Sequence, residues 1–178
     1  MGNGTSLRTQ GLRGRKVRAM PIRELLLDTF VHMPPLGALE AITSEDAVRS
    51  PAAGLHSVAA ILAHMEFWQS WFLDRCDGTA LPMATAAAVG WPTVSPEGWP
   101  PLVARFGAGL MRAAEIGEDR AQLSRPVTPA IEFPPLAHYT VHDALVHVAQ
   151  HNSHHLGQII TTRQLLRIWP PPSGSYTW

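Results

Sequence analysis

The chain has 178 residues, which favours a single domain. Hydrophobic residues make up 46% of it and charged residues 16%, so it can form a core and does not have the composition of a disordered segment. The formal net charge is zero at pH 7, but the first 18 residues hold no acid and five basic residues: Arg8, Arg13, Arg15, Lys16 and Arg18. We predict a flexible basic N-terminal tail over residues 1–19 and an acidic folded domain over residues 20–178.

The sequence excludes a membrane-spanning protein and a disulfide-stabilised one. Its most apolar stretch, residues 58–73, is interrupted by His64, Glu66 and Gln69. The single cysteine, Cys76, has no internal partner, so any metal site must use nitrogen and oxygen ligands. No apolar run behind the basic tail is long enough for a secretory signal. We expect a cytoplasmic protein that does not bind membranes. The acidic body of the chain is not a nucleic-acid surface, and the basic N-terminal segment, whose charges have no aromatic partners, is expected to be a solvated tail rather than an arm that touches nucleic acid.

The first part of the folded domain is predicted to be helical. A helix begins near Pro21, a residue accepted in a first turn, runs through Phe30 and stops at Pro34. Residues 36–50 are predicted to add a short helix.

A long second helix is predicted after Gly54. Ser57 is its expected N-cap, and the helix ends near Asp77. Residues at three- and four-residue spacing form its apolar stripe: Ile61, His64, Met65, Trp68 and Phe72. The stripe places His64 on the side of the helix that faces the core.

Two long connections and two more helices follow. Residues 79–98 are rich in Thr, Ala, Pro and Gly and are predicted to be a long connection. A third helix follows with one apolar stripe: Trp99, Leu102, Phe106, Leu110 and Ala113. Residues 119–137 contain four prolines and are predicted to be an extended crossover. The last helix begins at a capping box of Thr140 and Asp143 and runs to about Ile168.

These elements predict an all-α protein, because no segment alternates as a strand does. Four amphipathic helices joined by two long connections indicate a four-helix bundle with long crossovers. Short loops would force neighbouring helices to be antiparallel. The long connections of this chain leave the order of the helices open.

Histidines are concentrated at the last helix. Six of the nine fall within 18 residues: His138, His142, His147, His151, His154 and His155. The inward seam of this helix has three- and four-residue spacing: Val141, Leu145, Val148, Asn152, His155, Ile159, Thr162 and Leu166. His155 therefore faces the core.

His151 lies one turn before His155, which leaves their side chains about 40° apart on one face of the helix. Two histidines at this spacing are suited to bind one divalent ion. The spacing alone does not choose between this pair and the pair of His147 and His151. His154 is about 100° from His155 and is expected to face elsewhere.

His64 is the leading candidate for a third ligand. A polar ring on the apolar stripe of the second helix requires a partner. That partner is either another buried polar group or a metal ion, and the histidine pair on the last helix favours the ion. Glu66 is two residues further on and is expected to point away from His64.

Two features occur together in this chain: His64 on an apolar helix, and the later segment His151-Asn152-Ser153-His154-His155-Leu156-Gly157-Gln158-Ile159. In both features the chain resembles the DinB-like superfamily, which includes the YfiT-type metal-dependent proteins. The resemblance extends over residues 20–178. It implies a four-helix bundle in which one histidine of the second helix and two of an H-x3-H-x-G-Q motif on the last helix hold a divalent metal. By motif position, the implied ligands are His64, His151 and His155.

Three neutral imidazoles would leave a metal with an open position, as in catalytic sites. The resemblance implies a thiol S-transferase in which the metal activates a low-molecular-weight thiol as the nucleophile toward a small-molecule substrate. The alternatives are a metal-dependent hydrolase and a non-catalytic metal-binding stress-response protein. A third, a nucleic-acid-binding stress protein, rests only on the basic N-terminus. We expect zinc or nickel as the metal, with iron or copper as alternatives.

Exposed tryptophans and some relatives suggest a homodimer. Gln158 is expected either to orient a bound group or a ligand, or to close a contact between helices.

Overall fold

The computed structural model describes residues 21–28 and 31–175. Four helices form a bundle: α1 (Ile22–Leu27), α3 (Val58–Cys76), α4 (Trp99–Glu118) and α6 (Val141–Leu165). Short helices stand between them: η1 (Gly37–Leu39), α2 (Ser44–Val48), η2 (Ala87–Gly90), η3 (Pro96–Gly98), α5 (Arg120–Leu123) and η4 (Pro134–Leu136). The described residues contain no strand and only an isolated bridge between Pro126 and Thr140. The predicted all-α class is confirmed.

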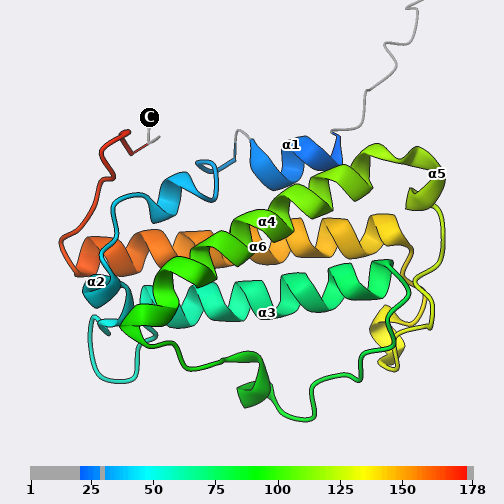
Figure 1. Ribbon diagram of the computed structural model, residues 1–178, viewed down its shortest axis with the longest axis horizontal. Coiled ribbons are helices and arrows are strands. Elements are labelled where there is room, and N and C mark those ends of the chain that lie inside the picture. Colours follow the sequence, from blue (N-terminus) through cyan, green and yellow to red (C-terminus); the bar gives the residue numbers. More distant parts are fainter. Residues whose placement is uncertain (1–20, 29–30, 176–178) are drawn as a thin grey trace, which may run out of the picture.

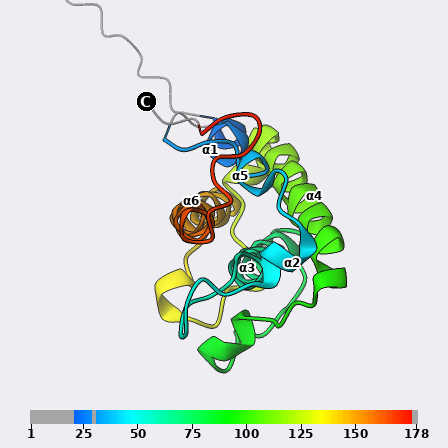
Figure 2. The ribbon, with the colours of Figure 1, turned by 90° about the vertical axis from the view of Figure 1, so that its left-hand side faces the viewer.

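The three long helices lie side by side, and α1 packs across α4 and α6 (Figures 1 and 2). Helices α3 and α4 run in the same direction, whereas α1 and α6 run in the opposite direction (Figure 1). The long connection between α3 and α4 returns the chain to the end of the bundle from which α3 began. The bundle is therefore not a simple up-and-down one. In the part of the chain that the structure describes, no helix is both long and apolar enough to cross a membrane.

The two helices that carry the clustered histidines begin at well-defined caps. Ser57 accepts a hydrogen bond from the backbone N–H of Ala60 at the start of α3. At the start of α6, the Thr140 hydroxyl accepts from the N–H of Asp143, and the Asp143 carboxylate accepts from the N–H of Thr140. Both caps occur at the residues that the sequence indicates, so the register of both helices is fixed from their first turns.

Polar side chains inside the core hold α6 against α3. Asn152, one residue after His151, donates from Nδ2 to Oε1 of Gln69 on α3 across 3.1 Å. Gln69 in turn donates to the backbone carbonyl of Phe106 on α4 across 2.9 Å. Both amides are nearly fully buried, and the Gln69 bonds link three helices. This link sets how α6 is rotated toward α3, and therefore which side chains of the two helices meet.

Two buried arginines tie the connections to the bundle. Arg163 of α6 donates to the carbonyls of Ala38, Glu40 and Ile168. Arg75 of α3 donates to the carbonyls of Leu81, Pro129 and Ala130. These hydrogen bonds satisfy backbone carbonyl groups of the loops, which no helical hydrogen bond satisfies.

The structure differs from the predicted elements in three places. Helix α1 ends at Leu27, because Asp28 leaves helical geometry, whereas the sequence suggests a helix through Phe30; Thr29 and Phe30 lie outside the described residues. The crossover 119–137 is not wholly extended, since the Asp119 side chain caps the turn of α5. Helix α6 ends at Leu165, and Arg167 has a positive φ of 60°. The predicted basic tail over residues 1–19 lies outside the described residues.

Candidate metal centre

Three histidines meet between α3 and α6. Nε2 of His151 lies 3.2 Å from Nε2 of His64 and 3.2 Å from Nε2 of His155. One ring nitrogen from each residue lies within 4.8 Å of those of the other two. His64 and His155 are buried, and His151 is half-buried. We call these residues the three-histidine cluster. It combines one residue from the middle of α3 with two residues one turn apart on α6.

The outer nitrogens of two of these rings have acceptor partners. Nδ1 of His64 lies 2.6 Å from the carbonyl oxygen of Gly90. Nδ1 of His155 lies 2.7 Å from Oε1 of Gln158. A carbonyl oxygen only accepts, so in both rings Nδ1 carries the proton and donates it. In the neutral ring the Nε2 atom then bears the lone pair, and both lone pairs are available on the side facing His151.

The donor set fits a divalent cation. Lone pairs on nitrogens 3.2 Å apart repel each other unless a proton or a cation lies between them. Two imidazole nitrogens that bind one zinc ion at about 2.0 to 2.1 Å in tetrahedral geometry are about 3.3 Å apart. The hydrogen bonds from Nδ1 to a carbonyl and to a carboxamide are the second contacts typical of metal-binding histidines.

Electrostatics keep the cluster neutral at ordinary pH. Burial, together with the neighbouring rings of His155, His64 and His147, lowers the pKa of His151 to about 3. Burial also lowers the pKa of His64 and of His155, although the bonds to Gly90 and Gln158 act in the opposite direction. Neutral imidazoles are the form that binds metal, so no proton has to be displaced at pH 7.

The connection 79–98 covers one side of the cluster. The Trp91 ring stacks on His64 with centroids 4.0 Å apart, and His56 stacks on the other face of Trp91 at 3.9 Å. A Cβ atom at position 90 would lie 3.0 Å from the Trp68 indole nitrogen and 3.5 Å from His64 Nδ1, so glycine permits this close approach. The sequence marks this segment only as a long connection and does not reveal that Gly90 and Trp91 contact the cluster.

Comparison with known proteins concerns the family and the fold of the chain. The family model described as the DinB superfamily matches residues 36–159, more than half of the chain, and this segment includes the whole three-histidine cluster. The chain belongs to the DinB superfamily. This DinB-superfamily chain has no match among the curated proteins.

The fold of this DinB-superfamily protein also occurs in a solved structure, that of a conserved protein from Enterococcus faecalis. The TM-score is 0.58, and the alignment covers 84% of this chain and 99% of that one. The two sequences are 18% identical, so the similarity concerns the fold alone.

The remaining histidines of the DinB-superfamily chain lie outside the cluster. His147 pairs through Nδ1 with the Tyr139 hydroxyl at 3.0 Å, and its ring centroid is 6.5 Å from that of His151. The structure therefore groups His151 with His155 rather than with His147. His154 is exposed, as its position on the helix indicates. Glu66 faces away from the cluster and pairs with Arg105 at 3.6 Å.

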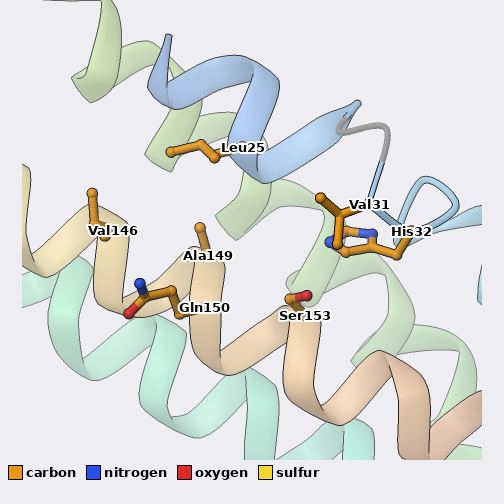
Figure 3. A pocket seen from close by; sticks show the side chains of 7 residues that line it. All are labelled: Leu25, Val31, His32, Val146, Ala149, Gln150 and Ser153. Carbon is orange, nitrogen blue, oxygen red and sulfur yellow. The ribbon is translucent and has the colours of Figure 1, made fainter. Parts of the chain in front are cut away.

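Two cavities adjoin α6 in this DinB-superfamily protein. One, of about 260 Å³, lies between α1 and α6 and is lined by His32, Gln150 and Ser153 among others (Figure 3). At 100° per residue, Ser153 is about half a turn around α6 from His155, so this cavity opens on the face opposite the cluster. The other, of about 590 Å³, includes Trp91 and Gln158 in its lining and therefore adjoins the cluster.

Proposed function

We propose that the three-histidine cluster binds one divalent metal ion through Nε2 of His64, His151 and His155. The observation that carries this proposal is the convergence of three Nε2 atoms, two of them at 3.2 Å from the third, with the outer nitrogens of two rings hydrogen-bonded to acceptors. Zinc or nickel suits these ligands best, with iron or copper as alternatives.

We further propose that the protein is a metal-dependent thiol S-transferase acting on a small-molecule substrate. A divalent ion held by three neutral imidazoles supplies a Lewis acid of undiminished charge with an open position, which lowers the pKa of a thiol that binds there. The cluster consists of imidazoles alone. This favours a thiol nucleophile over hydrolysis, which benefits from a carboxylate base beside the nucleophilic water.

The transfer itself needs little proton chemistry from the protein. The sulfur of the thiol forms a bond to an electrophilic carbon, and the bond from that carbon to its leaving group breaks. The leaving group departs with the electron pair of that bond, and the thiol proton passes to solvent. The protein residues supply orientation: Gly90 and Gln158 fix the rings of His64 and His155, and Trp91 covers the face of His64.

The test begins with elemental analysis of untagged protein. Turnover assays then pair small thiols with electrophilic substrates, with and without a chelator. The proposal predicts one ion per chain and thiol consumption that stops when the metal is removed. Hydrolysis of esters or amides without thiol consumption would indicate the hydrolase instead. A metal-dependent melting temperature with no turnover would indicate a non-catalytic metal-binding protein. A homodimer and a cytoplasmic location are further predictions that size measurement and cell fractionation test.

A further inference from the structure

The cavity of about 590 Å³ beside the three-histidine cluster has the size of a small-molecule site. It lies between the segment that precedes α3, the connection 79–98 and the C-terminal half of α6. Of the described residues that line it, five are apolar or glycine, among them Leu55, Trp91 and Leu165, and five are polar, among them His56, His154 and Gln158. We call it the α6 cavity.

The walls of the α6 cavity are suited to an uncharged, apolar ligand. None of the described residues that line it is Asp, Glu, Lys or Arg. Leu55 and Leu165 are 52% and 58% exposed, unusually high for leucines, and both belong to this lining. The Thr161 hydroxyl, also in the lining, already donates to the carbonyl of Gly157. The lining offers hydrogen-bonding groups, among them His56, His154 and Gln158, but no carboxylate, ammonium or guanidinium group, so an uncharged ligand that also covers the exposed leucine surface fits it best.

The α6 cavity shares two residues with the surroundings of the cluster. The Trp91 ring lines the cavity and stacks on His64. The Gln158 side chain lines the cavity and accepts the hydrogen bond from His155 Nδ1. A molecule in the cavity therefore contacts groups that touch two of the three histidines.

Gly157 provides a second, independent sign that the space is functional. It lies in the interior of α6, where glycine costs about 1 kcal/mol relative to alanine. Helical glycines usually permit another element to approach closely, but a Cβ atom at position 157 would have no neighbour within 4 Å. Its missing side chain leaves open space in the cavity rather than room for packing.

We propose that the α6 cavity binds the uncharged, apolar part of the electrophilic co-substrate and so sets the substrate class of the enzyme. This inference rests on the proposed transferase function, which supplies the nucleophile. An electrophile with an aromatic or branched aliphatic body fits the cavity beside the Trp91 ring, with its reactive carbon directed toward the three-histidine cluster.

The test uses the uncharged fluorophore N-phenyl-1-naphthylamine, whose emission rises in an apolar site, titrated into the full-length protein at pH 8. The Gly157→Phe variant places a phenyl group in the open space at this wall of the cavity. Gln164→Phe adds the same side chain at an exposed position of α6 that does not line the cavity, and serves as the control. We expect Gly157→Phe to raise the Kd of the probe by about tenfold or more, and Gln164→Phe to leave it within about twofold. The sulfonated analogue 1-anilinonaphthalene-8-sulfonate should bind wild-type protein more weakly than the uncharged probe.

Circular dichroism and metal content of each variant establish that the fold and the cluster are intact. Equal probe affinity in wild-type and Gly157→Phe protein, or tighter binding of the sulfonate, would overturn the inference. In turnover assays, Gly157→Phe should raise KM for an apolar electrophile and leave KM for the thiol unchanged. Probe binding that depends on Gly157, found together with absent thiol transfer, would support the α6 cavity as a binding site and refute the proposed function.

Discussion

Oε1 of Gln158 lies 2.7 Å from Nδ1 of His155, three residues earlier on α6, so a residue that lines the α6 cavity also fixes the tautomer of a residue in the three-histidine cluster. Neutral His155 then presents the lone pair of Nε2 to the cluster. The contact between Gln158 and His155 thus connects the α6 cavity to the three-histidine cluster, the two regions on which the proposals depend.

Loss of the Gln158 acceptor should weaken metal binding without removing it. Outer hydrogen bonds to metal-binding histidines contribute about 10- to 100-fold in affinity. We expect Gln158→Leu to raise the Kd for zinc by that factor, measured by competition with a chromophoric chelator. Gln158→Glu keeps an acceptor oxygen and should bind zinc at least as tightly as wild-type protein. An unchanged Kd in Gln158→Leu would show that the hydrogen bond does not tune the site.

Each member of the three-histidine cluster should be required for metal binding. We expect His64→Ala, His151→Ala and His155→Ala each to lose stoichiometric metal by elemental analysis, because each removes one of three ligands. His147→Ala is the matched control, since it removes a half-buried histidine one turn from His151 that pairs with Tyr139 instead. Loss of metal in His147→Ala with retention in His155→Ala would identify the other helical pair as the site.

Acid should destabilise the metal-free protein. The pKa of His151 is about 3 in the folded chain, against an ordinary value of 6.5, so between these pH values the unfolded chain binds more protons. The free energy of unfolding therefore rises with pH through this window and is fully restored above pH 6.5. We predict that the urea midpoint of chelator-treated protein falls between pH 7 and pH 5.

The same pH series with the His151→Gln variant separates the contribution of His151 to the pH dependence of stability from the contributions of other titratable groups. The variant lacks the imidazole, so its urea midpoint should change less between pH 7 and pH 5. The capping carboxylate of Asp143, whose pKa hydrogen bonds from Thr140 hold below its ordinary range, contributes only at lower pH. A wild-type midpoint that is constant or rises on acidification would contradict the assignment of a neutral, buried cluster.

Two glycines in helices should respond oppositely to the same substitution. A Cβ atom at Gly109 of α4 would overlap the Gln69 carboxamide, which bridges α4 and α6. Gly109→Ala should therefore destabilise the protein by about 1–3 kcal/mol despite the better helix propensity of alanine. Gly157→Ala meets nothing and should stabilise it by about 0.5–1 kcal/mol. Thermal unfolding of the two variants provides the comparison, and a stabilising Gly109→Ala would show that Gln69 moves without cost.

Local signals in the sequence were sufficient for most of the fold. Ser57 and the pair of Thr140 and Asp143 begin α3 and α6 because side-chain oxygens satisfy the free N–H groups of a first turn. The apolar stripes of α3 and α4 are buried as their spacing predicts, except that Trp68 is only partly buried. The predicted end of α1 was wrong. The helix ends at Leu27 because Asp28 leaves helical geometry, although no glycine or proline marks a stop there.

His151 and His155 lie one turn apart on one face of α6, and His64 lies on the apolar stripe of α3. Residue spacing along each helix was therefore sufficient to predict these two placements. The meeting of the three histidines depends on the contact between α3 and α6, which includes the buried Gln69 and Asn152 bridge, and no local pattern specifies it. The roles of Gly90 and Trp91 were beyond prediction for a related reason. The path of a long connection is decided by tertiary contacts such as the stack of Trp91 on His64.

A single cation held by three imidazoles from α3 and α6 would be visible in an anomalous-difference map of crystals grown with zinc and recorded at the zinc absorption edge. We expect one peak per chain, about 2.0–2.1 Å from Nε2 of His64, His151 and His155. An absent peak, or one bound by His147 or by surface residues instead, would contradict this expectation.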